Sequence, residues 1–94
     1  DYEKNTGLVI AETFEKRSLN PVAVPGVNVF NHGPFAWGSD CFEAVHNAVV
    51  MEYVAKMALM TEQINPDILP IGNAIADKHY SRKHGANAYY GQKK

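Results

Sequence analysis

The chain has 94 residues, of which 46% are hydrophobic and 20% charged, and its formal net charge is −1. This composition is typical of one globular domain, and the near-neutral charge argues against a nucleic-acid-binding surface, which requires a basic stripe. No run approaches the roughly 20 apolar residues of a membrane helix. The single cysteine, Cys41, excludes a disulfide within the chain and favours a reducing, cytoplasmic compartment.

The beginning of the chain carries neither an initiator methionine nor the pattern of a signal peptide. We interpret the chain as a portion of a longer one. A chain this short buries only roughly 60–65% of its unfolded surface, so we expect a partner to cover part of its core.

The first element predicted from the pattern is a helix over residues 8–17. Asn5 or Thr6 is a suitable N-cap for it. Ile10 and Phe14 are four residues apart and would form one apolar stripe, which predicts a surface helix packed on a sheet.

A histidine follows the next predicted element, a strand over residues 26–31 that is rich in β-branched side chains. Beyond His32, the Gly33-Pro34 pair predicts a rigid turn that carries the chain away. We expect the side chain of Trp37 to form one side of the site around His32. Such a histidine is either a hydrogen-bonded turn residue or a metal ligand. Catalytic zinc requires three protein ligands, and the residue spacing in this chain identifies only one candidate ligand, His32.

The longest predicted element is a helix over residues 40–63, with Ser39 as its N-cap. Two apolar stripes follow it at spacings of three and four residues. The first contains Phe42, Val45, Val49, Tyr53, Met57 and Met60, and the second contains Ala44, Ala48, Met51, Ala55 and Ala58. A helix apolar over so much of its circumference is usually covered on two sides, so we expect another part of the parent protein or another subunit to cover it. His46 and Cys41 are interpreted as packing residues.

A final helix is predicted to run to about His84, with Asn73 as its N-cap and Gly85 as its C-cap. Its second half is basic and rich in imidazoles, which indicates either a solvated face with favourable dipole placement or a contact with an anion or sugar phosphate. The tail, residues 86–94, has no regular period. Its adjacent Tyr89 and Tyr90 suggest that it docks on another surface, where a phenol can act as a general acid or base.

Taken together, these stretches resemble the C-terminal part of the sugar-phosphate epimerases in the class II aldolase/epimerase family. The resemblance runs nearly end to end. It rests on TG (6–7), ETFEK (12–16), PGV (25–27), HGPFAWG (32–38), AVHNA (44–48), DKHY (77–80), RKHGA (82–86) and YYGQ (89–92). The HGPFAWG stretch is shared widely in the family, whereas the tail is specific to the epimerase branch. One departure is Phe30, where a histidine is often found.

The resemblance implies an α/β fold, a three-layer α/β/α arrangement around a largely antiparallel sheet, of which residues 1–94 would form the C-terminal part of one domain. It implies a homotetramer with active sites between neighbouring subunits, and a catalytic Zn²⁺ held by three histidines. His32 matches the third of these ligands. Tyr90 matches an acid/base tyrosine reaching in from a neighbouring subunit, and His79 and Glu3 fall near the substrate. The other two histidines, the phosphate-binding loops and an opposing acid/base aspartate would lie outside this chain.

The implied reaction converts L-ribulose 5-phosphate into D-xylulose 5-phosphate, a step of arabinose catabolism, by inversion at C4. That carbon has no acidic proton, so cleavage and re-formation of the C3–C4 bond is the reasonable route. Three alternatives stay open: an aldolase of the same family, a non-catalytic piece that supplies subunit contacts, and a small metal-free binding module.

Overall fold

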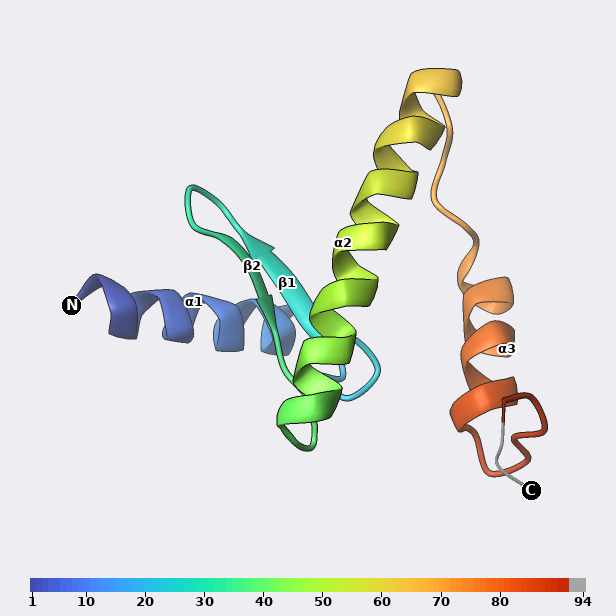
Figure 1. Cartoon of the computed structure of the whole chain (residues 1–94), viewed down its shortest axis with the longest axis horizontal. Helices are drawn as coiled ribbons and strands as arrows, with labels where there is room; N and C mark the ends of the chain where they lie inside the picture. The colour runs from blue at the N-terminus through green and yellow to red at the C-terminus, as the bar shows by residue number, and fades with distance from the viewer. Residues whose placement is uncertain (92–94) are drawn as a thin grey trace.

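Three helices and one β-hairpin make up the part of the chain that the computed structural model describes, residues 1–91 (Figure 1). The elements are α1 (Tyr2–Lys16), β1 (Gly26–Val29), β2 (Gly33–Ala36), α2 (Cys41–Ile64) and α3 (Asn73–His84). The two strands pair in antiparallel register, Gly26 opposite Ala36 and Val29 opposite Gly33. This mixture of helices with a small antiparallel sheet confirms the α/β class, while the three-layer arrangement stays a prediction.

Helix α1 begins at Tyr2, so the prediction of a start at residue 8 with Asn5 or Thr6 as N-cap was wrong. The Thr6 hydroxyl donates to the carbonyl of Tyr2 at 2.7 Å, a bond back along the helix that lets threonine sit inside it. Asp1 occupies the N-cap position and Glu3 the first turn, where negative charge favours the positive end of the helix dipole.

Residues 33–36 form strand β2, so the prediction of a Gly-Pro turn here was also wrong. The chain reverses earlier, over residues 30–32, and the His32 amide closes the loop by donating to the Val29 carbonyl at 3.0 Å. Asn31, at φ 62°, and Gly33, at φ 115°, supply the positive φ angles of this reversal. Pro34 is tolerated in β2 because an outer strand does not need every amide as a donor.

Helix α2 was predicted to within one residue at either end, but its N-cap is Asp40 and not Ser39. The Asp40 carboxylate accepts the Glu43 amide at 2.8 Å, and the Glu43 carboxylate in turn accepts the amide of Ser39. This reciprocal pair is a variant of the capping box. The hairpin packs on α2 at Gly26, where an added Cβ would lie 2.9 Å from the Met51 sulfur.

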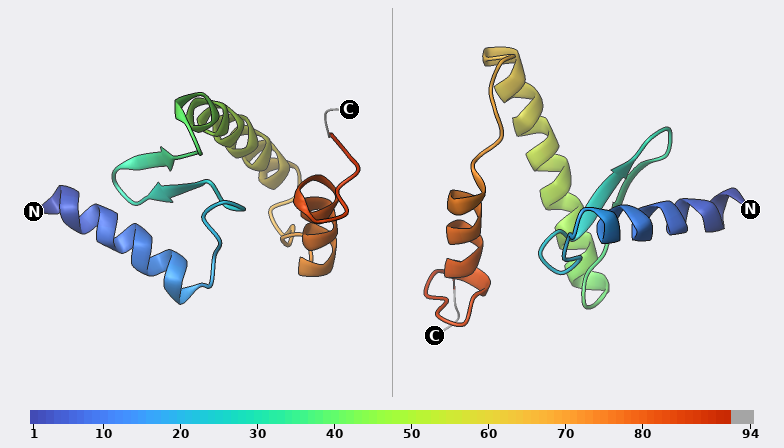
Figure 2. Two further views of the ribbon diagram at one scale, coloured as in Figure 1. Left: turned by 90° about the horizontal axis from the view of Figure 1, so that it is seen from below. Right: turned by 180° about the vertical axis from the view of Figure 1, so that it is seen from behind.

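Helix α3 confirms the predicted end at His84 and the Gly85 C-cap, but it begins at Asn73 itself, so the N-cap is Gly72 and not the predicted Asn73. It stands apart from the other elements in the described part of the chain (Figures 1 and 2). The predicted tail is described only as far as Gly91, so Gln92 and the two lysines after it lie outside the described residues.

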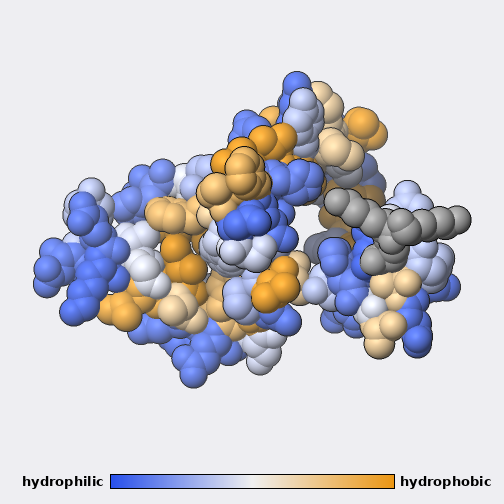
Figure 3. All heavy atoms as spheres, turned by 60° about the horizontal axis from the view of Figure 1, so that its bottom comes forward, coloured by the Kyte–Doolittle hydropathy of each residue, from blue (hydrophilic) through white to orange (hydrophobic). Residues whose placement is uncertain are grey.

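Only Phe14, with 8% of its surface exposed, is buried among the described residues. The accessible surface is 8400 Å², against about 5,400 Å² for a folded monomer of 10.4 kDa. The radius of gyration is likewise 15.3 Å, against about 12 Å for a compact chain of this length. Figure 3 shows hydrophobic side chains on the surface of one face, and no residue of α2 is buried. The excess, about 3,000 Å² on this chain alone, is surface that a compact folded chain of this size would not expose.

Among residues 1–91, no helix has both the length and the apolar character needed to cross a bilayer.

Candidate functional site

The hairpin turn fixes the backbone of His32 at one end of a groove between α1 and the hairpin. The groove has a volume of about 500 Å³. Its apolar lining consists of Val9, Ile10, Val27, Val29 and Phe30. Its polar lining consists of Tyr2, Asn5, Thr6, Thr13, Arg17, Asn28 and His32. A concave surface that combines apolar side chains with polar groups able to orient a ligand is the usual form of a small-molecule site.

The His32 ring is exposed and stacks on Tyr2, with ring centroids 5.8 Å apart and planes 20° apart. The stack ties the hairpin turn to the first turn of α1, which also carries Glu3. Glu3 follows Tyr2 in that turn but does not line the groove, so its placement near the substrate stays a prediction. The contribution of Tyr2 was missed, because 30 residues separate it from His32 and no local pattern links them.

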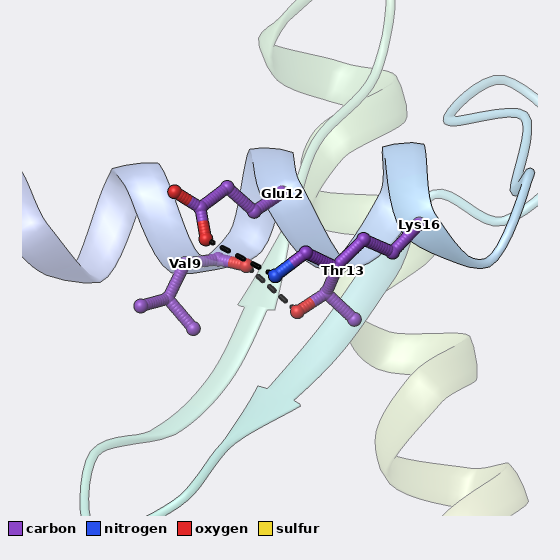
Figure 4. A network of polar contacts seen from close by, with 4 residues as sticks. All are labelled: Val9, Glu12, Thr13 and Lys16. Carbon is purple, nitrogen blue, oxygen red and sulfur yellow. Dashed lines mark hydrogen bonds and ion pairs between the residues drawn. The ribbon is translucent and has the colours of Figure 1, made fainter.

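The hydroxyl groups of the two threonines in the groove both donate hydrogen bonds to backbone carbonyls of α1, so they are not available as donors to a ligand. Thr13 donates to the carbonyl of Val9 at 2.7 Å (Figure 4), as Thr6 does to Tyr2. The outer face of α1 carries an exposed ion pair between Lys16 and Glu12 at 3.7 Å, also drawn in Figure 4. Such a pair contributes little to stability. The side chains that can still donate to a ligand in the groove are therefore Tyr2, Asn5, Arg17, Asn28 and His32.

Trp37 does not line this groove, so the expectation that it walls the histidine was wrong. Its indole N–H donates to the Pro21 carbonyl at 2.8 Å, and its ring meets Phe14 edge to face, with centroids 5.4 Å apart. The carbonyl of Trp37 accepts from the Asn47 side-chain amide at 2.8 Å. Trp37 thus joins α1, the segment between α1 and β1, and α2 at the end of β2 opposite the hairpin turn.

Glu43 is the titratable group whose environment is most clearly perturbed in the described residues. Its pKa is lowered from the ordinary 4.5, first by the hydrogen bond from the Ser39 amide, then by the Ser39 side chain and by the charge of His46. This site stabilises the start of α2 and has no evident ligand. His46 and Cys41 were interpreted as packing residues. Both are exposed, so neither is buried against another element in the described part of the chain.

Tyr90 lies beside the end of α3, where the guanidinium of Arg82 sits 4.7 Å from the centroid of its ring. His79 is exposed on α3, and His84 stacks on Tyr80 with centroids 4.7 Å apart. Helix α3, which carries His79, and the tail after it, which carries Tyr90, stand apart from the hairpin whose turn carries His32 (Figures 1 and 2). The predicted residues thus form two groups, one around the hairpin turn and one around α3.

No group of three His, Cys, Asp or Glu side chains in residues 1–91 is placed to hold a metal ion. His32 can supply one imidazole. Catalytic zinc sites use three protein ligands, so a metal at His32 requires ligands from beyond the described residues.

Comparison with known proteins places the chain in a family. Residues 1–59 match the Class II Aldolase and Adducin N-terminal domain, and the chain belongs to this family.

Individual relatives share more of the chain. It is 57% identical over 93 residues to a protein of Salmonella paratyphi C (strain RKS4594) named L-ribulose-5-phosphate 4-epimerase UlaF, and 56% identical to the protein of that name in Salmonella typhi. Each alignment covers 99% of this chain and 40% of the relative. The chain therefore spans about two fifths of the length of these relatives.

Proposed function

We propose that the protein containing this chain is a zinc-dependent L-ribulose-5-phosphate 4-epimerase that works in the cytoplasm as a homotetramer. The observation that carries the proposal is 57% identity, over 99% of this chain, to a protein named for that activity. Residues 1–94 would be the C-terminal part of a single three-layer α/β/α domain. The large exposed surface and the separation of the two residue groups support an assembly in which neighbouring subunits complete each site.

His32 fits the role of one zinc ligand. Its backbone is fixed by the hairpin turn, its ring is exposed, and among residues 1–91 its imidazole makes no hydrogen bond that would compete. When bound, zinc supplies a Lewis acid to the C2 carbonyl and C3 hydroxyl of the substrate. Tyr2 restrains the imidazole through the ring stack, and the neighbouring polar groups of the groove can orient the sugar.

Tyr90, supplied by a neighbouring subunit, would move the proton on the C4 oxygen. Removal of that proton accompanies cleavage of the C3–C4 bond, whose electrons stay with the three-carbon enediolate while C4 becomes the aldehyde of glycolaldehyde phosphate. The aldehyde turns and re-adds through its other face, and an acid on the opposite side returns a proton to the C4 oxygen. Tyr90 therefore serves one face of the aldehyde, and His79 and Glu3 would lie near the bound substrate.

Zinc content and turnover of two variants test these roles separately. We expect His32→Asn to lower both the zinc content and the activity. Tyr90→Phe should keep the zinc and lower kcat by about 10²-fold or more, as expected for loss of a general acid or base. Full zinc occupancy in His32→Asn, or an unchanged kcat in Tyr90→Phe, would contradict the corresponding role.

A second candidate is an aldolase, which the description of the matching family favours. An aldolase would release glycolaldehyde phosphate, whereas an epimerase keeps it bound until the bond re-forms. A coupled assay for free aldehyde distinguishes the two. A third candidate, a non-catalytic chain that supplies subunit contacts, is supported by the exposed α2 and predicts neither zinc nor turnover.

A further inference from the structure

The chain folds back on α3 after Gly85 and places Tyr90 beside Arg82. The backbone amides of Tyr89 and Tyr90 both donate to the Arg82 carbonyl, at 2.9 and 3.0 Å, and the Ala88 amide donates to Gly85 at 3.0 Å. The last carbonyls of a helix have no partner within the helix, so these bonds both complete the end of α3 and anchor the tail. The backbone of Tyr90 is thus held by one residue of the helix.

The same residue also holds the ring of Tyr90. The Arg82 guanidinium carbon lies 4.7 Å from the ring centroid, and the Lys83 ammonium lies 5.7 Å from it. A cation at this distance is attracted to the face of an aromatic ring. Arg82 is half-buried, and its Nε is buried without a hydrogen-bond partner in the described structure, so the phenol ring is a principal contact of this side chain. Tyr90 remains 53% exposed, which leaves part of the side chain accessible.

We propose that Arg82 is a positioning residue for Tyr90, one that fixes the orientation of the ring before substrate binds. This inference rests on the proposed acid/base role of Tyr90. A proton-transfer group contributes fully only when it is held in line with the reacting atom. Arg82 fixes two things at once: its carbonyl sets the position of the backbone, and its guanidinium sets the plane of the ring.

Side-chain substitutions at Arg82 isolate the second contribution, because they leave the carbonyl in place. We expect Arg82→Ala to lower kcat about tenfold with little change in KM, as loss of orientation without loss of substrate binding predicts. Arg82→Lys keeps a cation over the ring and should recover part of the loss. Arg82→Met keeps the apolar stem without the charge and should not.

A double-variant cycle gives the decisive comparison. If Arg82 acts through Tyr90, adding Arg82→Ala to Tyr90→Phe should change kcat by less than about twofold. Fully additive losses, or a rise in KM as the main effect of Arg82→Ala, would overturn the proposal and indicate direct contact of Arg82 with the sugar phosphate.

Ring signals of tyrosine in NMR spectra supply a readout independent of activity. The Tyr90 signals are identified by their absence in Tyr90→Phe, and they should shift in Arg82→Ala and Arg82→Met while staying near their original position in Arg82→Lys. If the Tyr90 ring signals did not shift in Arg82→Ala, that result alone would overturn the proposal that Arg82 positions the Tyr90 ring. An active Tyr90→Phe variant would instead refute the catalytic role of Tyr90, so the two failures are distinguishable.

Discussion

Replacement of Phe14 by alanine tests whether one aromatic contact organises the N-terminal half of the chain. Phe14 is 8% exposed and meets the ring of Trp37 edge to face. Burial of about 150 Å² of apolar surface at about 25 cal per mol per Å² corresponds to about 4 kcal/mol. The ring contact adds about 1 kcal/mol. Since typical Phe→Ala losses are about 3–5 kcal/mol, we expect a decrease of that size in the free energy of unfolding.

Fluorescence of Trp37, the single tryptophan, reports this change directly in a urea titration. A loss of about 4 kcal/mol, with a slope of about 1–2 kcal/mol per molar urea, lowers the midpoint by about 2–4 M or abolishes the transition. Phe30→Ala is the matched control, because Phe30 is 89% exposed and an exposed substitution changes stability by about 0.5 kcal/mol or less. Equal midpoints for the two variants would refute the role assigned to Phe14.

Three further predictions concern the hairpin and the start of α2. The pKa of Glu43 is lowered in the folded state, so its stabilising effect is present above the ordinary pKa of 4.5 and is lost as the pH falls through the lowered value. Unfolding midpoints should therefore fall more steeply with acid in the wild type than in Glu43→Gln, and parallel profiles would contradict the assignment. Asn31→Ala places alanine at φ 62° and should lower stability by about 1 kcal/mol, whereas Asn31→Gly should not. Equal thermal midpoints for these two variants would disprove the strained turn. Gly38→Ala would bring a Cβ to 2.6 Å from the Ala44 amide nitrogen, so we expect a loss of about 1–3 kcal/mol in urea unfolding, and a neutral result would show that this approach is not tight.

The long helices could be predicted because their signals are local. The apolar spacing located α2 to within one residue at either end, although its N-cap was taken one residue too early, and Gly85 correctly marked the end of α3. Helix α1 was placed too late because its first turns are polar and carry no apolar stripe, although Asp1 and Glu3 favour a helix start.

The hairpin was missed because Gly33-Pro34 has the chemistry of a turn. The reversal instead takes its positive φ angles from Asn31 and from Gly33, the first residue of β2, and Pro34 continues that strand. Strand pairing depends on contacts across the chain, which no local pattern records.

The candidate site was predicted only in part, since its residues come from distant segments. His32 and Tyr90 were identified from the resemblance, whereas their neighbours Tyr2 and Arg82 emerge only from the folded chain. Both contacts depend on where the helices end relative to the turn and the tail. Sequence spacing does not specify that geometry.

Subunit complementation tests most directly whether His32 and Tyr90 from different subunits form one active site. His32→Asn and Tyr90→Phe proteins, each with little activity, are unfolded, mixed in equal amounts and refolded together, with each variant refolded alone as the control. If neighbouring subunits share each site, random assembly leaves about a quarter of the sites with both native residues, and about a quarter of the wild-type activity should return. Activity no higher than that of the separately refolded variants would contradict the shared site.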